Sequence, residues 1–355
     1  MRRIGYRLLT VTLAVFLLTA ARDPPDVLRR GINITHWFRF PPNPDPAALR
    51  GYLDDAALEA LKRAGFTFVR IPVQPEFLAV PQALLAAVRR VQRHGLAVMV
   101  APFAAEWHPE TDAGDRARLL AFWGSLAPRL RSFDPALTFP EVLNEPVFAE
   151  DPSAWVTLQH DAAAVIRRSL PRDTIVLTGA NWGSIDGLLK LPPEPDPNVL
   201  YSFHFYEPAE LTALGAFRPG LDSPAMARLP FPVQDTAQCQ RAADSTPDAD
   251  TTGLIHFYCE RRWDAAKIAG RIAEASEWAR RNHVLVFAGE FGASERLNAP
   301  ARLAWLTAVR EFCERGGIGW ALWGYDDSMG LGVAPGDRPR FDPALMRALR
   351  LNPTQ

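Results

Sequence analysis

The sequence of 355 residues has few cysteines and lacks the short motifs that mark several common enzyme classes. Its three cysteines form no C-x-x-C, which argues against a thioredoxin-like redox motif and a zinc ribbon. It contains no H-E-x-x-H, no G-x-S-x-G and no phosphate-binding P-loop, which excludes the metalloproteases, serine hydrolases and nucleotide-binding proteins that carry them. The seven histidines are scattered singly, so we predict no metal site and no cofactor.

The sequence also lacks an excess of charge of either sign. Lys and Arg total 39 and Asp and Glu total 40, a net charge of −1, so we expect no overall basic surface for nucleic acid. Hydrophobic residues make up 48% and charged residues 22% of the chain. This composition provides enough apolar side chains for a large core.

The N-terminal segment does not have the pattern of a folded domain. Arg2, Arg3 and Arg7 precede an uncharged run over residues 8–20, and small residues follow it. The run is shorter than the ~20 residues that a membrane-spanning helix needs, and the pattern is typical of a secretory signal peptide. We therefore predict a signal peptide at residues 1–21, one mature domain at residues 22–355, and a secreted or periplasmic protein without stable membrane insertion. An uncleaved anchor is the alternative.

The three cysteines allow one disulfide, and the sequence does not decide whether it forms. In an exported protein, Cys239 and Cys259 could pair, and closing a loop of about twenty residues contributes roughly 3 kcal/mol in the chain-entropy model. Cys313 lies in an apolar stretch and is predicted to be a small buried core residue. Because the count is odd, the sequence does not decide the pairing.

Short apolar runs alternate with longer amphipathic segments along the rest of the chain. Eight runs are typical of strands buried on both faces, at residues 31–34, 67–73, 96–101, 137–143, 174–178, 199–205, 284–288 and 318–323. Helices are predicted at residues 55–64, 81–94, 115–133, 152–170, 264–283, 301–315 and 342–351, with a short one at 185–191. This alternation predicts an α/β fold with a parallel sheet, and eight units predict a single-domain (β/α)8 TIM barrel. A doubly wound sheet is the alternative, but no G-x-G-x-x-G follows the first strand.

Residues 206–262 interrupt the alternation. The segment is rich in Pro, Asp and Ala and has no clear element, so we predict a long insertion after the sixth strand. In a barrel it would overhang the carboxyl-terminal face, where a Cys239–Cys259 disulfide would hold it as a lid.

Two carboxylates directly follow apolar strand segments. Glu145 follows the fourth predicted strand and Glu290 the seventh. Because a carboxylate is costly to desolvate, each needs a partner or a chemical task. The carboxyl ends of barrel strands converge on one face, so we expect the two side chains to meet there. Arg70, at the end of the second strand, could keep one of them ionised through a charge-assisted hydrogen bond.

Two facing carboxylates are the minimum set of groups for cleaving a glycosidic bond. One must be protonated to donate to the leaving oxygen, and the other must be ionised to attack carbon or activate water. Their surroundings therefore have to separate their pKa values.

With these residues, the chain resembles glycoside hydrolase family 5, the cellulase-type retaining hydrolases built on a (β/α)8 barrel. The resemblance runs over residues 30–323 and rests on L-N-E-P at 143–146, H-F-Y at 204–206, G-E-F-G at 289–292 and a tryptophan on the eighth strand. It implies that Glu145 is the general acid/base and Glu290 the nucleophile, with Arg70 and Tyr206 orienting Glu290. The other implied site residues are Asn144 on the sugar 2-hydroxyl, His204 beside the acid/base, Trp323 as the stacking floor, and Asn33 on the first strand.

One position departs from the family pattern. The family usually carries a histidine at the end of the third strand, where this chain has Val98-Met99-Val100-Ala101-Pro102-Phe103. His108 follows a few residues later and could take its place. The departure bears on substrate details more than on the two carboxylates.

Further tryptophans follow apolar runs. Trp37, Trp107 and Trp182 could line sugar subsites, because aromatic faces pack well against pyranose rings. Core packing is the alternative for each of them.

These observations predict a retaining hydrolase of β-linked polysaccharides, first of all an endo-β-1,4-glucanase of the cellulase type. A β-mannanase or an exo-β-glucanase on the same barrel is an alternative, and so is a barrel that binds carbohydrate without catalysis. The expected partner is a polysaccharide or oligosaccharide, and a monomer is expected.

Overall fold

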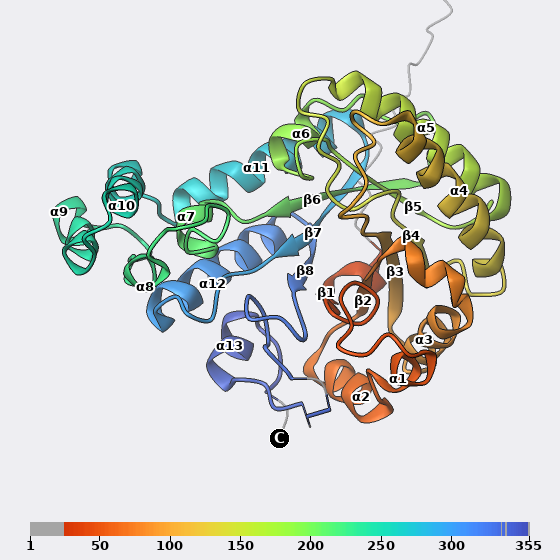
Figure 1. The fold of residues 1–355 in the computed structure, drawn as a ribbon, viewed down its shortest axis with the longest axis horizontal. Coiled ribbons are helices and arrows are strands. Elements are labelled where there is room, and N and C mark those ends of the chain that lie inside the picture. The colour runs from red at the N-terminus through yellow and green to blue at the C-terminus, as the bar shows by residue number, and fades with distance from the viewer. Residues whose placement is uncertain (1–24, 335, 338, 354–355) are drawn as a thin grey trace, which may run out of the picture.

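The computed structural model describes residues 25–334, 336–337 and 339–353. The predicted signal peptide, residues 1–21, lies outside this part. Figure 1 shows strands surrounded by helices, and the eight strands are all parallel to their neighbours. The strands are β1 (Arg30–Asn33), β2 (Phe68–Val73), β3 (Ala97–Pro102), β4 (Thr138–Pro140), β5 (Ile175–Thr178), β6 (Val199–Phe205), β7 (Leu285–Phe291) and β8 (Gly319–Trp323).

The strand order confirms the predicted barrel. The sheet runs β4-β3-β2-β1-β8-β7-β6-β5, so β1 and β8 are neighbours. Its two ends meet at a parallel bridge between Glu141 and Val176, where the Val142 N–H donates to the Val176 carbonyl at 2.9 Å. This contact joins β4 to β5 and closes the ring.

Alternation along each strand decides which side chains point into the barrel. A buried apolar cluster takes members from strands β2 to β8, including Phe68, Phe139, Leu200 and Phe287, and fills the amino-terminal part of the interior. Successive strand residues point to opposite faces, so the residue two positions after each of these also points inward. On β2 this residue is Arg70, and after β4 it is Glu141, so polar groups occupy the carboxyl-terminal part of the interior.

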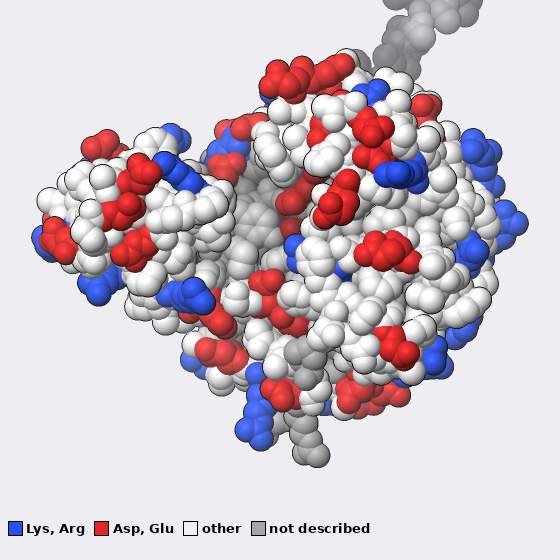
Figure 2. All heavy atoms as spheres, in the orientation of Figure 1, with Lys and Arg blue, Asp and Glu red and all other residues white. Residues whose placement is uncertain are grey.

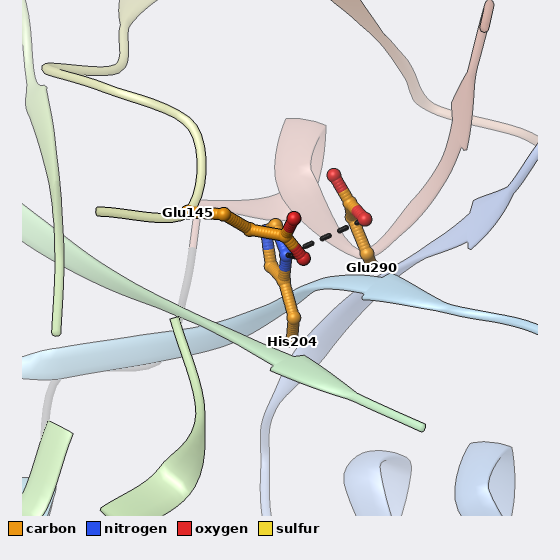
Figure 3. A group of neighbouring side chains, drawn as sticks. All are labelled: Glu145, His204 and Glu290. Carbon is orange, nitrogen blue, oxygen red and sulfur yellow. Dashed lines mark hydrogen bonds and ion pairs between the residues drawn. The ribbon is translucent and has the colours of Figure 1, made fainter. Parts of the chain in front are cut away.

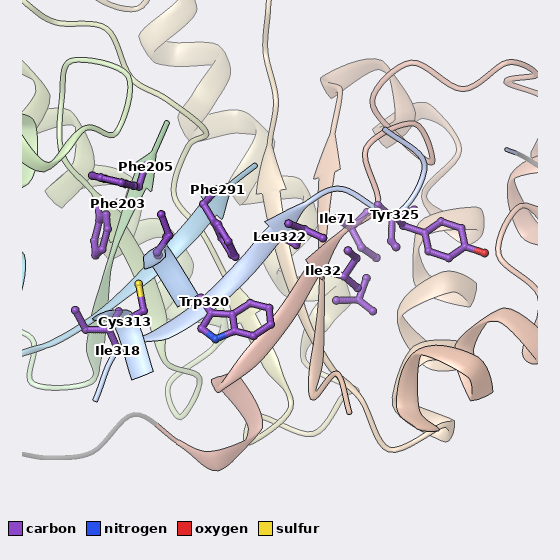
Figure 4. Close-up of a cluster of buried hydrophobic side chains, with 14 of the residues drawn as sticks. Ile32, Ile71, Phe203, Phe205, Phe291, Cys313, Ile318, Trp320, Leu322 and Tyr325 are labelled. Atoms are coloured by element: carbon purple, nitrogen blue, oxygen red, sulfur yellow. The ribbon is translucent and has the colours of Figure 1, made fainter. Parts of the chain in front are cut away.

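Helices cover the outside of the ring. They are α1 (Pro46–Gly51), α2 (Asp55–Ala64), α3 (Pro81–Arg93), α4 (Ala113–Leu130), α5 (Pro152–Ser169), α6 (Ile185–Leu189), α11 (Ala265–Asn282), α12 (Ala299–Arg315) and α13 (Pro343–Ala348), with 3-10 turns η1 (Asp26–Leu28) and η2 (Pro75–Ala79). Local sequence explains their ends: Asp54 caps the N-terminus of α2, and Gly65 ends it with a φ of 106°. Between strands and helices lies the main core, in which Trp320 and Phe291 pack edge to face (Figure 4). Cys313 is buried there as a free thiol, as predicted.

Residues 206–264 stand apart from the ring of helices, to the left in Figure 1. The segment contains α7 (Ala209–Thr212), α8 (Ser223–Met226), α9 (Thr236–Gln240), η3 (Arg241–Ser245) and α10 (Ala249–Arg261). The prediction of no clear element here was wrong, because most of these helices are too short for a hydrophobic period to show. Their caps do show in the sequence: Asp222, Asp235 and Asp248 begin α8, α9 and α10.

A disulfide between Cys239 and Cys259 joins α9 to α10, with 5.7 Å between the Cα atoms. The segment flanks one side of a hollow in the surface (Figure 2). No helix in the described part of the chain is long and apolar enough to cross a membrane.

Candidate active site

Glu145, His204 and Glu290 meet at the carboxyl-terminal end of the barrel (Figure 3). His204 and Glu290 belong to neighbouring strands and are register partners on β6 and β7. Glu290 thus lies within β7, which continues three residues beyond the predicted end of that strand. Glu145 comes from the loop between β4 and α5, and its φ of 44° is in the left-handed region. A non-glycine residue seldom adopts this conformation, and such strain is concentrated at functional sites.

The histidine lies between the two carboxylates. His204 Nδ1 is 2.9 Å from Glu145 Oε1 and 3.3 Å from Glu290 Oε2. One ring nitrogen of His204 and one carboxylate oxygen from each glutamate all lie within 4.8 Å of one another. Retaining glycosidases hold their carboxyl groups about 5–5.5 Å apart, whereas inverting enzymes leave about 6.5–9.5 Å for a water molecule. The spacing in this site therefore fits direct attack by one carboxylate.

The two carboxylates have different surroundings. The Glu145 side chain is 30% exposed and can be reached from the cleft, whereas Glu290 is only 4% exposed. Glu290 accepts hydrogen bonds from Arg70 Nη1 at 2.6 Å and from the Tyr206 hydroxyl at 2.9 Å. Glu290 is therefore held in one orientation, while Glu145 retains access to a ligand.

Burial and charge act in opposite directions on this cluster. Burial raises the pKa of Glu290 and nearby Glu145 adds to the rise, while His204, Arg70 and Tyr206 lower it, with a net shift upward. Burial lowers the pKa of His204, but Glu290 and the hydrogen bond to Glu145 outweigh it, so this pKa is raised. Burial, together with the charge of Glu290, raises the pKa of Tyr206 well above its usual value. Tyr206 is thus a hydrogen-bond donor to Glu290 at any moderate pH.

Arg70 is the centre of a buried network beneath the carboxylates. Its side chain is fully buried and binds Glu290 on one edge. On the other edge it donates to both oxygens of Glu141, at 2.7 and 2.8 Å. Burial lowers the pKa of Arg70, but the charges of Glu141 and Glu290 outweigh it and the net shift is upward. The guanidinium therefore stays charged and fixed beside Glu290.

Glu141 was missed by the sequence reasoning. It is fully buried at the bridge that closes the barrel, and its partner is Arg70 from the opposite side of β3. The signal was present, because a carboxylate within the apolar run at 137–143 is as costly to desolvate as Glu145 directly after it.

The two asparagines complete this network. Asn33 Oδ1 accepts from Arg70 Nη1 at 2.9 Å, and its amide donates to the carbonyls of Gly289 and Leu322. Asn33 and Arg70 are both 0% exposed, so neither side chain can touch a ligand in the cleft directly. They act on the site by holding other side chains. Asn144 Oδ1 accepts from Arg70 Nη2 at 2.8 Å, and Asn144 retains 8% exposure at the edge of the cleft.

Three of the four tryptophans singled out in the sequence lie in different environments. Trp182 is 54% exposed, and its backbone N–H donates to the Pro146 carbonyl, next to Glu145. Trp323, at the end of β8, is 7% exposed. Trp37 is fully buried, and its indole N–H donates to the Leu49 carbonyl at 2.7 Å. Trp37 is thus part of the core, which corrects its prediction as a substrate-binding residue.

A different side chain occupies the position of the missing third-strand histidine. Phe103 directly follows β3, and the Arg39 guanidinium lies 4.2 Å from the centre of its ring. His108 is 67% exposed, with its Nδ1 3.3 Å from Glu110 Oε1. Among the described residues its only ion pair is thus with Glu110, and it forms none with Glu145 or Glu290.

Glu145, His204 and Glu290 also have the donor types and the spacing that could hold a divalent cation. The Arg70 guanidinium, 2.6 Å from Glu290, already provides positive charge to one of these donors. A second cation at the same carboxylate would be repelled, so the donor set fits a proton-transfer site better than a metal site.

A parallel eight-stranded barrel places its active site at the carboxyl ends of its strands, and two facing carboxylates there are the groups that a retaining glycoside hydrolase needs. The family model for cellulase (glycosyl hydrolase family 5) matches residues 35–328. The chain therefore belongs to glycosyl hydrolase family 5.

Individual relatives agree with this family. The chain is 27% identical to Endoglucanase 3 of Fibrobacter succinogenes over 84% of its own length and 49% of that protein. It is 22% identical to Endoglucanase H of Acetivibrio thermocellus over 93% of its length and 34% of that protein. The chain thus spans half or less of the length of these two relatives.

Solved structures share the fold. Endoglucanase Cel5A of Thermotoga maritima superposes with a TM-score of 0.74 at 25% identity, covering 92% of this chain and 98% of that one. Cellulose synthase subunit Z of Clostridioides difficile superposes with a TM-score of 0.71 at 22% identity, covering 91% and 99%.

Proposed function

We propose that this protein is a retaining β-glycoside hydrolase, and specifically an endo-β-1,4-glucanase of the cellulase type. The observation that carries the proposal is the pair of facing carboxylates, one reachable and one buried against Arg70 and Tyr206. Their spacing of less than 4.8 Å between donor oxygens suits a double displacement.

In the first step, Glu290 attacks the anomeric carbon as the bond to the leaving oxygen breaks, and Glu145 donates its proton to that oxygen. In the second step, Glu145 takes a proton from water, the water oxygen attacks the anomeric carbon, and the bond to Glu290 breaks. Two inversions give net retention. Arg70 and Tyr206 favour the ionised form of Glu290 that the attack requires.

Both His204 and the buried asparagine network would orient these groups. His204 Nδ1 contacts both carboxylates, so it can hold Glu145 in place both when Glu145 is protonated and when it is ionised. Asn144, anchored by Arg70, would present its amide to the sugar 2-hydroxyl. Trp323 and Trp182 would provide aromatic surfaces on either side of the cleavage point.

The names of the relatives support a choice of substrate. The two curated relatives above are endoglucanases, and structures of Thermotoga maritima Cel5A are titled as complexes with cellobiose and with mannotriose. These names support β-1,4-glucan as the first substrate to test. The complex with mannotriose makes a β-mannan the second substrate to test.

Hydrolysis of carboxymethyl cellulose, mannan and mixed-linkage glucan, followed by reducing-sugar release, tests the activity. We expect release from at least one of them, and a loss of at least about a thousandfold in Glu290→Ala and in Glu145→Ala on an unactivated substrate. Product lengths from defined oligosaccharides separate endo from exo action. Binding without release from any polymer would favour a carbohydrate-binding barrel instead.

We also propose that residues 1–21 are removed on export, that residues 22–355 form the catalytic domain, and that it acts as a secreted or periplasmic monomer without a cofactor. The Cys239–Cys259 disulfide supports an oxidising compartment, because such bonds persist mainly outside the cytosol.

A further inference from the structure

Arg39 is a cation in the cleft that the proposed mechanism does not use. Its backbone is fixed by its neighbour Phe38, which bridges to Val73 and accepts a hydrogen bond from the Gln74 N–H at 2.8 Å. The guanidinium carbon lies 5.1 Å from the ring centre of Trp323 and 4.2 Å from that of Phe103. Arg39 is thus held between the ends of β8 and β3, at the mouth of the barrel.

The guanidinium has no partner of its own. Among the described residues, no carboxylate lies within 4.0 Å of it, and its Nε is buried without a hydrogen-bond partner. The aromatic rings pack against the guanidinium, including Phe40 at 4.5 Å, and rings cannot accept its N–H bonds as oxygens do. Burial lowers the pKa of Arg39 and the net shift is downward, although the charges of Glu290, Asp327 and Glu145 act in the opposite direction.

An unpaired guanidinium packed against aromatic rings is suited to an oxyanion such as a carboxylate or a phosphate. Its planar row of N–H donors matches the two oxygens of a carboxylate, which can accept two parallel hydrogen bonds. The surrounding carboxylates would repel an anionic polysaccharide, so Arg39 provides the local attraction that such a chain needs. Figure 2 shows basic atoms within the hollow as well as acidic ones.

We propose that Arg39 makes this site selective for a β-glucan that carries carboxylate groups on the sugar beside Trp323. The inference rests on the proposed hydrolase function and specifies its substrate class. The geometry that carries it is the position of the unpaired guanidinium against Trp323 and Phe103.

The test uses cello-oligosaccharides of equal length, one set unmodified and the other oxidised to carboxylates at C6. For wild type, we expect kcat/KM on the oxidised set to exceed that on the unmodified set by about tenfold or more, as a charge-assisted bidentate bond provides. High salt should reduce this ratio, because it screens the charge. In Arg39→Met the ratio should fall to about one or lower, mainly through KM, and Arg39→Lys should restore part of it.

Arg315→Met is the matched control, because Arg315 also lies on a phenylalanine ring, at 4.2 Å from the Phe312 centre, but on α12. It should leave the ratio at the wild-type value. A wild type that prefers the unmodified set, or an Arg39→Met variant that keeps the wild-type ratio, overturns the inference while leaving the hydrolase function intact. If wild type cleaves neither set nor any polymer, the proposed function fails, and this inference with it.

Discussion

Replacing Glu141 with glutamine tests the electrostatic account of the buried network. Glu141 and Glu290 bind opposite edges of the Arg70 guanidinium, so two negative charges share one positive charge. Two unit charges about 6 Å apart in an effective dielectric constant of about 20 repel by about 3 kcal/mol. On this argument, the negative charge of Glu141 disfavours the ionised form of Glu290.

Glu141→Gln removes that charge and nearly conserves side-chain volume. The pKa of Glu290 should fall, so a larger fraction of Glu290 is ionised at low pH. The acid limb of the kcat/KM profile, which reports this group in the free enzyme, should move to lower pH by about one to two units. Arg70 keeps its bonds to Glu290, Asn33 and Asn144, so it should remain in place.

The same variant should also be less stable. Arg70 donates to both oxygens of Glu141, through Nε and Nη2. In the variant one of these oxygens is replaced by an amide NH2 group, so one of the two Arg70 donors loses its acceptor. We expect the free energy of unfolding to fall by about 2–3 kcal/mol, measured by urea denaturation.

Glu59→Gln, at an exposed ion pair with Arg63 on α2, is the control and should change neither quantity. If the acid limb of Glu141→Gln instead moves to higher pH, the reasoning is refuted. Glu141 would then act chiefly by holding Arg70 against Glu290.

Three further variants test the placement of individual side chains. Trp182→Ala should raise KM for cello-oligosaccharides by about three- to tenfold, because an exposed stacking surface is lost, and an unchanged KM would place sugar elsewhere. The double variant Cys239→Ala/Cys259→Ala should lower the free energy of unfolding by about 3 kcal/mol, and equal stability of the two proteins would contradict the disulfide's contribution. Trp37→Phe should lower the free energy of unfolding by about 1–3 kcal/mol, because the hydrogen bond to the Leu49 carbonyl is lost. A raised KM at unchanged stability would instead indicate that Trp37 contacts substrate.

The predicted elements match the structure closely where their patterns are long. The helix at residues 55–64 and the strand at residues 199–205 have the predicted bounds. The fourth strand is shorter than predicted, Thr138–Pro140 instead of residues 137–143, because the chain leaves the regular ladder after Pro140. Within residues 206–262, α7, α8 and α9 showed no hydrophobic period because helices of four or five residues span little more than one turn, and the 13-residue α10 was also missed.

The amino-acid pattern alone is enough to predict the barrel and to single out Glu145 and Glu290 at the ends of its strands. The hydrophobic period indicates which residues form strands. A carboxylate directly after a buried strand is costly to desolvate, so a partner or a chemical role is expected for it. The contacts between polar side chains, in contrast, become visible only once the strands are assembled into the ring. Asn33 and Trp37 are sealed in the interior, Glu141 is paired with Arg70, and Arg39 lies unpaired in the cleft. The physical reason is that a strand's pattern assigns a side chain to a face, whereas its partners come from strands far away in the chain, whose approach is set by packing around the whole ring.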